Sequence, residues 1–191
     1  MRDSKSSSGT DSLAGHLLLA HPVLKDANFR RTAILMSSHN EEGAMGVVLN
    51  RPLNKRLGEL GGDFAFGPLA KVPLFYGGPV EKRQVILCAW RPHPTEPEEG
   101  EAFQLLFGLD TARATELAEE EGVEMRAYLG YAGWSSGQLE GELESDTWVV
   151  ADLEPELIQR PADESLWRHV LGGLDPQWRL LAGEPDDPGL N

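Results

Sequence analysis

The stretch that decides the fold is residues 32–49, TAILMSSHNEEGAMGVVL. Two runs of β-forming residues, Thr32 to Ser38 and Met45 to Leu49, flank the turn-forming residues Asn40-Glu41-Glu42-Gly43. Apolar and β-branched residues favour strands, and a short polar connection that contains glycine favours a hairpin. The stretch therefore predicts two antiparallel strands.

Short β signals continue on both sides of this hairpin. They are His16 to Ala20, Val72 to Tyr76, Gln84 to Trp90, Phe103 to Phe107, Met125 to Tyr131 and Trp148 to Ala151. The turn residues Gly77-Gly78-Pro79 predict that the second and third of these runs pair with each other. Because Pro52 has no N–H to donate, we expect the chain to leave the sheet there.

Helical signals are fewer. Asp110 or Thr111 can cap a helix that ends at Gly122, and Asp163 can cap another that ends at Gly172-Gly173. Helical turns are expected at Leu53 to Leu60 and Gly137 to Glu144. Many strands with few, unevenly spaced helices predict a single α+β domain, not a regular βαβ repeat.

The length of 191 residues suits one domain. We expect an ordered domain over residues 14–181, disordered tails at 1–13 and 182–191, and an exposed loop from Pro92 to Gly100. Cys88 is the only cysteine, which fits a reducing compartment. No run approaches the roughly 18 apolar residues of a membrane helix, so we expect a cytoplasmic protein.

Charge is divided unevenly along the chain. Residues 1–91 hold 12 Lys and Arg against 8 Asp and Glu, whereas residues 92–191 hold 5 against 23. A net charge of −14 repels phosphate backbones and makes direct nucleic-acid binding unlikely. The acidic half favours a basic partner surface. A local basic patch keeps direct DNA binding as an alternative: Arg30, Arg31, Arg51, Lys55 and Arg56.

The sharpest chemical motif is Gly133-Trp134-Ser135-Ser136-Gly137, which has the G-x-S-x-G pattern of serine hydrolases. A serine hydrolase using Ser135 is therefore an alternative function. No parallel βα repeat surrounds the motif, and His169 lies inside an expected helix, so we assign no catalytic residue. His16, His21, His39 and Asp26 match no metal-binding spacing, and no metal or cofactor is predicted.

A candidate ligand pocket combines four residues. Asn50 and Arg51 place polar groups at the end of an expected strand, and Trp134 with Gln138 would add an aromatic wall and an amide. The alternative is that these residues only build turns and satisfy strand ends. The partner would be an unknown protein or a small molecule.

Two ordered sets of motifs resemble a known family. One is GHLLLAHP at 15–22 followed by GAMGVVLNRP at 43–52, and the other is GYAGW at 130–134 followed by GQLE at 137–140, with YGGPV at 76–80 between them. Together they are similar to the AlgH/YqgE family of bacterial cytoplasmic proteins over roughly residues 14–181.

This resemblance implies a mostly antiparallel, bent sheet resembling a barrel with outer helices. The family carries the label of transcriptional regulator, which implies a role in gene expression without requiring DNA contact. It has no established catalytic mechanism and tolerates Gly, Ala or Pro at the positions of Ser135 and Ser136. We therefore expect a noncatalytic binding or regulatory module.

Overall fold

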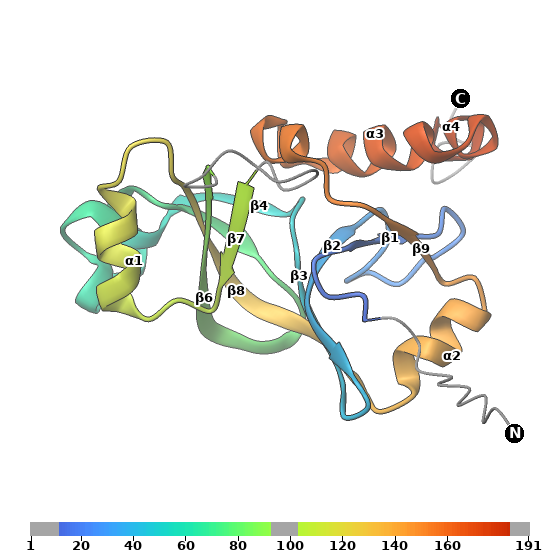
Figure 1. Ribbon diagram of the computed structural model, residues 1–191, viewed down its shortest axis with the longest axis horizontal. Coiled ribbons are helices and arrows are strands. Elements are labelled where there is room, and N and C mark those ends of the chain that lie inside the picture. The colour runs from blue at the N-terminus through green and yellow to red at the C-terminus, as the bar shows by residue number, and fades with distance from the viewer. Residues whose placement is uncertain (1–11, 93–102, 184–191) are drawn as a thin grey trace, which may run out of the picture.

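The computed structural model describes residues 12–92 and 103–183. Its strands form one mixed, mostly antiparallel sheet that curls into a half-barrel (Figure 1). The strands are β1 (Leu17–Ala20), β2 (Ala33–Asn40), β3 (Gly43–Val48), β4 (Pro52–Arg56), β5 (Pro73–Tyr76), β6 (Val80–Pro92), β7 (Phe103–Phe107), β8 (Glu124–Ser135) and β9 (Trp148–Ala151). The expected single α+β domain with a bent, barrel-like sheet is confirmed.

The helices lie outside the sheet: α1 (Thr111–Ala118), α2 (Gln138–Glu144), α3 (Glu164–Leu174) and α4 (Pro176–Gly183). In Figure 1, α3 and α4 run along one side, α1 lies at one end and α2 near the other. Short 3-10 turns occupy Leu57–Leu60, Gly62–Phe64, Pro68–Lys71 and Pro155–Gln159. Within the described ranges, no helix has the length and apolar character needed to cross a membrane.

The hairpin predicted from residues 32–49 is present. Ile34 pairs with Val48 and Asn40 with Gly43, in antiparallel register with an irregularity between Met36 and Ser38. The predicted caps are also present, since the Asp110 and Asp163 side chains accept backbone hydrogen bonds at the starts of α1 and α3.

The expected pairing across Gly77-Gly78-Pro79 is wrong. Both β5 and β6 pair with β8 instead: Ala127 has Leu74 as its parallel partner and Leu87 as its antiparallel partner. A strand residue has one neighbour on each edge, so β5 and β6 lie on opposite edges of β8. The chain must cross β8 between them.

The crossing brings two backbones into contact. A Cβ atom at Gly78 would lie 2.1 Å from the carbonyl carbon of Tyr131, and one at Gly130 would lie 2.5 Å from the Gly78 oxygen. Both residues also have positive φ, 156° and 69°, where side chains are disfavoured. Glycine is therefore required on both sides of the crossing.

Three other expectations are corrected. Pro52 does not end the sheet but begins the edge strand β4, opposite Phe75, because a first position on an edge strand tolerates the missing donor. The helical turn expected from Leu53 starts only at Leu57. Gly172 and Gly173 do not end α3, which continues to Leu174, and Gly172 faces Arg179 of α4.

The domain also extends into both predicted tails. Ser12 donates to the His39 carbonyl, and the Leu13 amide donates to His39 Nδ1. Ala182 is buried within α4. The rest of both tails, and the loop predicted after Pro92, lie outside the described residues.

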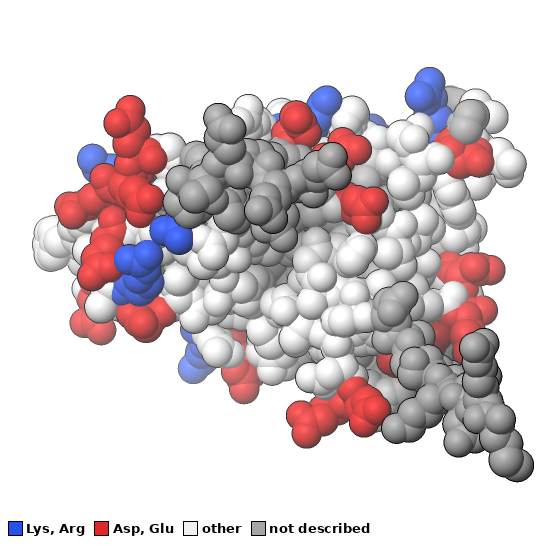
Figure 2. Space-filling model, viewed as in Figure 1, with Lys and Arg blue, Asp and Glu red and all other residues white. Residues whose placement is uncertain are grey.

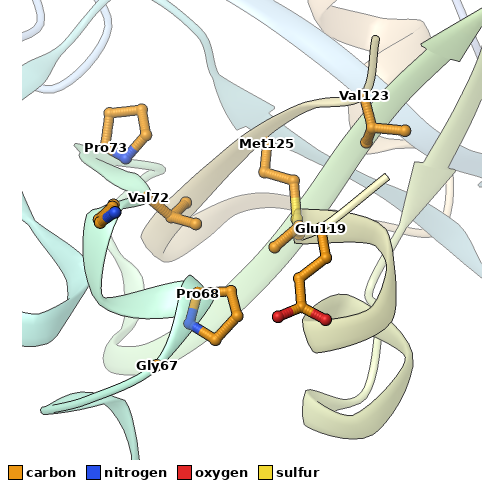
Figure 3. Close-up of a pocket in the computed structure, with 9 residues that line it drawn as sticks. Gly67, Pro68, Val72, Pro73, Glu119, Val123 and Met125 are labelled. Atoms are coloured by element: carbon orange, nitrogen blue, oxygen red, sulfur yellow. The ribbon is translucent and has the colours of Figure 1, made fainter. Parts of the chain in front are cut away.

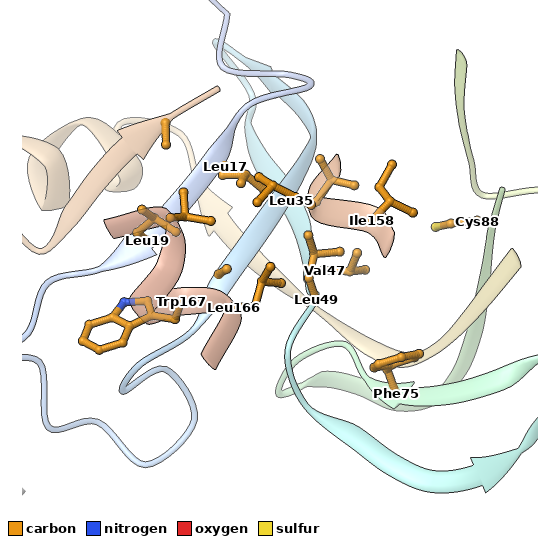
Figure 4. Close-up of a cluster of buried hydrophobic side chains, with 14 of the residues drawn as sticks. Leu17, Leu19, Leu35, Val47, Leu49, Phe75, Cys88, Ile158, Leu166 and Trp167 are labelled. Atoms are coloured by element: carbon orange, nitrogen blue, oxygen red, sulfur yellow. The ribbon is translucent and has the colours of Figure 1, made fainter. Parts of the chain in front are cut away.

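The largest hydrophobic cluster joins α3 to the sheet (Figure 4). The cluster includes Trp167 and Leu166 of α3, Leu19 and Leu35 of β1 and β2, and Phe75 and Cys88 of β5 and β6. The Trp167 indole also donates to the Ala20 carbonyl at 2.8 Å. Burial of this side chain fixes the start of α3 beside β1.

Replacing Gly77 by alanine should destabilise the protein, because the new Cβ would lie 2.2 Å from the Gly130 oxygen. We expect a loss of about 1–3 kcal/mol or more in the free energy of unfolding, measured by urea unfolding with tryptophan fluorescence. Gly141→Ala is the control: its Cβ meets nothing within 4 Å in α2, so it should be neutral or stabilising by up to about 1 kcal/mol. If both variants lost the same free energy of unfolding, the close backbone contact where the chain crosses β8 would be contradicted.

Candidate functional site

Asn50 and Arg51, two of the four candidate residues, line a cavity of about 480 Å³. The cavity lies between the end of β3, the start of β4 and the start of α3. Its other lining residues are Ala27, Asn28, Pro52, Leu53, Tyr76, Asp163 and Glu164. The volume falls within the range of small-molecule sites.

Asn50 uses its amide to build the cavity wall. Its Oδ1 accepts from the Ala33 amide at 3.0 Å and its Nδ2 donates to the Arg31 carbonyl at 2.9 Å. The side chain is 1% exposed, and buried amides need such partners. Asn50 therefore holds the loop before β2 against the end of β3.

The Arg51 guanidinium could still bind an anion. It donates to the Arg30 carbonyl at 2.5 Å, and the described residues place no carboxylate within ion-pair distance of it. The side chain is half-buried. Desolvation lowers its pKa, a shift that the Glu164 charge opposes and the Arg30 charge adds to. Arg51 is thus a partly desolvated cation that no carboxylate in residues 12–92 or 103–183 pairs directly.

The remaining wall of the cavity carries both hydrogen-bond donors and hydrogen-bond acceptors. The Tyr76 hydroxyl lies 3.4 Å from Asn28 Oδ1, and burial, then the Asp26 charge, raises the pKa of Tyr76, so the hydroxyl stays protonated. Glu164 pairs with Arg31 at 2.8 Å. The cavity therefore presents a cation, a hydroxyl, an amide and carboxylates.

Sequence reasoning missed Asn28, Tyr76 and Glu164 as members of this site. They come from segments far apart in the chain, and no motif spacing connects them. The one local signal was the helix cap at Asp163, which correctly placed the start of α3. Backbone strain is a second marker that only the structure shows, since Arg31 and Asn54 beside the cavity have φ of 53° and 55°.

Trp134 and Gln138 lie elsewhere. Trp134 pairs with Ala44, near the first residue of β3, whereas Asn50 follows the last. Six strand residues span about 20 Å, and neither Trp134 nor Gln138 lines the cavity. The structure does not bring the four candidate residues into one pocket.

Trp134 and Gln138 instead bind Glu142 of α2. Glu142 Oε2 accepts the indole N–H groups of Trp134 at 2.8 Å and Trp148 at 2.7 Å, and Oε1 accepts from Gln138 Nε2 at 2.9 Å. The two indoles meet edge-on, with centroids 5.9 Å apart. One carboxylate thus ties α2 to β8 and β9.

His39 adds a second tie to the same helix. Its Nε2 lies 3.0 Å from Glu140 Oε1. The backbone N–H of Glu140 and then the His39 ring hold the pKa of the Glu140 carboxyl below its ordinary value. The other histidines go to separate partners, His16 to Asp152 and His21 to the Trp178 ring.

Ser135 is not arranged as a nucleophile. Its hydroxyl lies 3.2 Å from Gln138 Oε1, and the hydrogen bonds of the described chain join no histidine to it. A hydrolase elbow follows a strand of a parallel sheet. The strand before Ser135, β8, instead pairs antiparallel with β3 and β6 and parallel only with β5. Cys88 is buried, and desolvation raises its pKa to about 12, so its thiol is unreactive.

Glu142→Ala should leave two buried indole donors unpaired, with a loss of about 2–4 kcal/mol in the free energy of unfolding. Near-ultraviolet circular dichroism should also lose signal from Trp134 and Trp148. Glu144→Ala removes an exposed carboxylate from the same helix and should change the free energy by less than about 0.5 kcal/mol. A Glu142 variant as stable as the control would show that the network contributes nothing.

Comparison with known proteins gives a consistent result. The profile of the AlgH-like family matches residues 17–179. A UPF0301 protein of Streptomyces coelicolor is 38% identical over 187 residues, covering 94% of this chain and 96% of its own, and one of Chlorobium luteolum is 35% identical over 182 residues, covering 93% and 94%.

Solved structures agree. The solution structure of the AlgH protein from Pseudomonas aeruginosa has a TM-score of 0.65 at 26% identity, covering 98% of this chain and all of that one. Protein DIP2367 from Corynebacterium diphtheriae shares the fold, with a TM-score of 0.68 at 23% identity over 90% and 92% of the two chains. The matched region and the full-length similarity show that this chain belongs to the AlgH-like family.

Proposed function

We propose that the protein is a noncatalytic binding module whose cavity at Arg51 takes a small carboxylic acid that also carries hydrogen-bond donors. The observation behind this proposal is the half-buried Arg51 guanidinium in the cavity wall, with which no described carboxylate forms an ion pair. Burying a cation is costly unless it is paired, and a ligand carboxylate would pair it. A carboxylate matches the planar donor fork of arginine better than a single-atom anion does.

The opposite wall selects among anions. Asp163 and Glu164 line the cavity with Arg51, so a phosphate dianion would meet two like charges. A ligand whose carboxylate binds Arg51 and whose ammonium or hydroxyl groups face Asp163 or Glu164 satisfies both sides. The hydroxyl of Tyr76 and the amide of Asn28 supply further neutral contacts. The supported class is therefore amino acids and hydroxy acids.

A regulatory role would then work through ligand-dependent contact with another protein. Direct DNA binding has less support, because carboxylates lie within the basic patch. Arg31 pairs with Glu164, and Asp163 and Glu164 line the same cavity as Arg51, so a DNA phosphate would meet like charges there.

If the protein does not act through direct DNA contact, it should show no appreciable binding to duplex DNA, even at low salt. Fluorescence anisotropy with a labelled duplex would measure it. Tight binding that falls steeply with salt, and that Lys55→Gln and Arg56→Gln weaken, would instead assign the patch to phosphate contacts.

The ligand proposal predicts that at least one amino acid or hydroxy acid in a small-molecule panel binds the wild-type protein, detected by ligand-observed NMR. Arg51→Gln should weaken that binding about 10-fold or more, because a hydrogen bond to a charged group contributes about 1.5–3 kcal/mol. Inorganic phosphate should bind more weakly than the carboxylate.

Lys55→Gln is the matched control, since Lys55 is an exposed cation of β4 outside the cavity lining. It should bind as the wild type does. Urea unfolding of Arg51→Gln separates lost binding from lost folding. The proposal fails if no carboxylate binds, or if both variants lose affinity equally. Labelling of Ser135 by a fluorophosphonate probe would favour the hydrolase alternative.

A further inference from the structure

A second cavity, of about 490 Å³, lies at the α1 end of the molecule. Its walls are the 3-10 turn Pro68–Lys71, the start of β5, the end of α1 and the start of β8. Apolar side chains predominate among its lining residues, which are Gly67, Pro68, Lys71, Val72, Pro73, Ala118, Glu119, Val123 and Met125. Figure 3 shows Pro68 of the 3-10 turn next to Glu119 at the end of α1, with Met125 above them and Val123 at the upper right.

A large aromatic residue is exposed beside this cavity. Phe66 is 89% exposed and directly precedes the lining residues Gly67 and Pro68. Leu60, on the adjoining 3-10 turn, is 44% exposed. Apolar surface next to an apolar cavity is typical of protein interaction sites, since monomeric proteins seldom leave such surface together. We call this cavity, together with the exposed side chains of Phe66 and Leu60, the Phe66 surface.

Acidic side chains border the Phe66 surface on the α1 side. Glu119, Glu120 and Glu121 are exposed, and the described residues offer none of them an ion pair. The nearby cation Arg113 is already paired with Glu116 at 2.8 Å. Figure 2 shows the same excess of acidic groups around α1. Among the residues that line the cavity, Lys71 on the opposite wall is the one cation, and Arg56 donates to its backbone carbonyl.

This charge decides which occupant fits. Nucleic acids and anionic lipid surfaces would be repelled by the glutamates. A second copy of the chain would bring another set of the same glutamates, and each copy has a net charge of −14. A basic protein segment is attracted, and its apolar side chain can fill the cavity.

We propose that the Phe66 surface docks a basic segment of a partner protein, with a bulky apolar side chain of that segment inserted between Pro68, Val123 and Met125 and its cations facing Glu119 to Glu121. Phe66 packs on the flank of the docked segment. The site is separate from the Arg51 cavity and stands whether or not that cavity binds a carboxylate.

Two synthetic probes test the docking. One is a lysine-rich helical peptide with leucines at i, i+3, i+4 and i+7, and the other has alanine at those positions. Fluorescence anisotropy with the full chain should show binding of the leucine peptide that is about 10-fold or more tighter than that of the alanine peptide, since each buried leucine gains the transfer free energy of its side chain.

Single substitutions test whether the leucine peptide binds at the Phe66 surface. Phe66→Ser should weaken the leucine peptide about fivefold or more through the lost apolar contact. Leu180→Ser, which removes a 78% exposed leucine from α4, should have no effect. Glu119→Lys should weaken binding and flatten its salt dependence. Glu42→Lys changes the net charge equally on the distant β2–β3 hairpin and should leave affinity within about twofold.

Three results would overturn the proposal. The first is no binding at millimolar peptide, and the second is equal weakening by Glu119→Lys and Glu42→Lys, which would show diffuse charge attraction. The third is a dimer in sedimentation of the wild-type protein that Phe66→Ser abolishes, which would make a second copy the occupant. Because every variant lies outside the Arg51 cavity, these results are independent of carboxylate binding.

Discussion

The crossing of β8 by Gly77 and Gly78 is the constraint on which the rest of the structure depends. It places β5 on one edge of β8 and β6 on the other, so that a single strand joins both parts of the curled sheet. The close backbone contact at Gly130 is possible only without side chains. Both cavities are consequences of this arrangement, because β5 contributes Tyr76 to one and Pro73 to the other.

The polar residues near the two ends of β3 differ in whether neighbours within the protein already satisfy them. Asn50 and Glu142 have their hydrogen-bonding groups occupied by neighbours within the protein, and they hold loops and helices in place. Arg51 differs because no carboxylate of the described residues forms an ion pair with it, although the Glu164 charge acts on it from nearby. Counting which polar groups are already satisfied therefore separates a structural role from a binding role, and this count singles out Arg51 among the four candidate residues.

The uneven charge of the chain becomes a spatial separation in the fold. The cation of Arg51 belongs to the weakly basic first half, and the glutamates near α1 belong to the strongly acidic second half. Each lies beside a cavity of similar volume, about 480 and 490 Å³. The first has a cation, carboxylates and amides among its lining residues, and there we propose a small carboxylic acid. The second is lined mostly by apolar residue types with exposed glutamates beside it, and there we propose a basic segment. Together, the two proposals would connect a small molecule to a protein partner.

The sequence by itself determined the local elements: the hairpin at residues 32–49 and the caps Asp110 and Asp163. These follow from propensities and short-range hydrogen bonds that act within a few residues. Only the tertiary structure decided that β5 pairs in parallel with β8 and that Arg51 shares a cavity with Tyr76 and the start of α3. Such contacts, for example Leu74 with Ala127, join distant parts of the chain that no local pattern connects. They arise because the curled sheet must bury its apolar face while satisfying every buried backbone group.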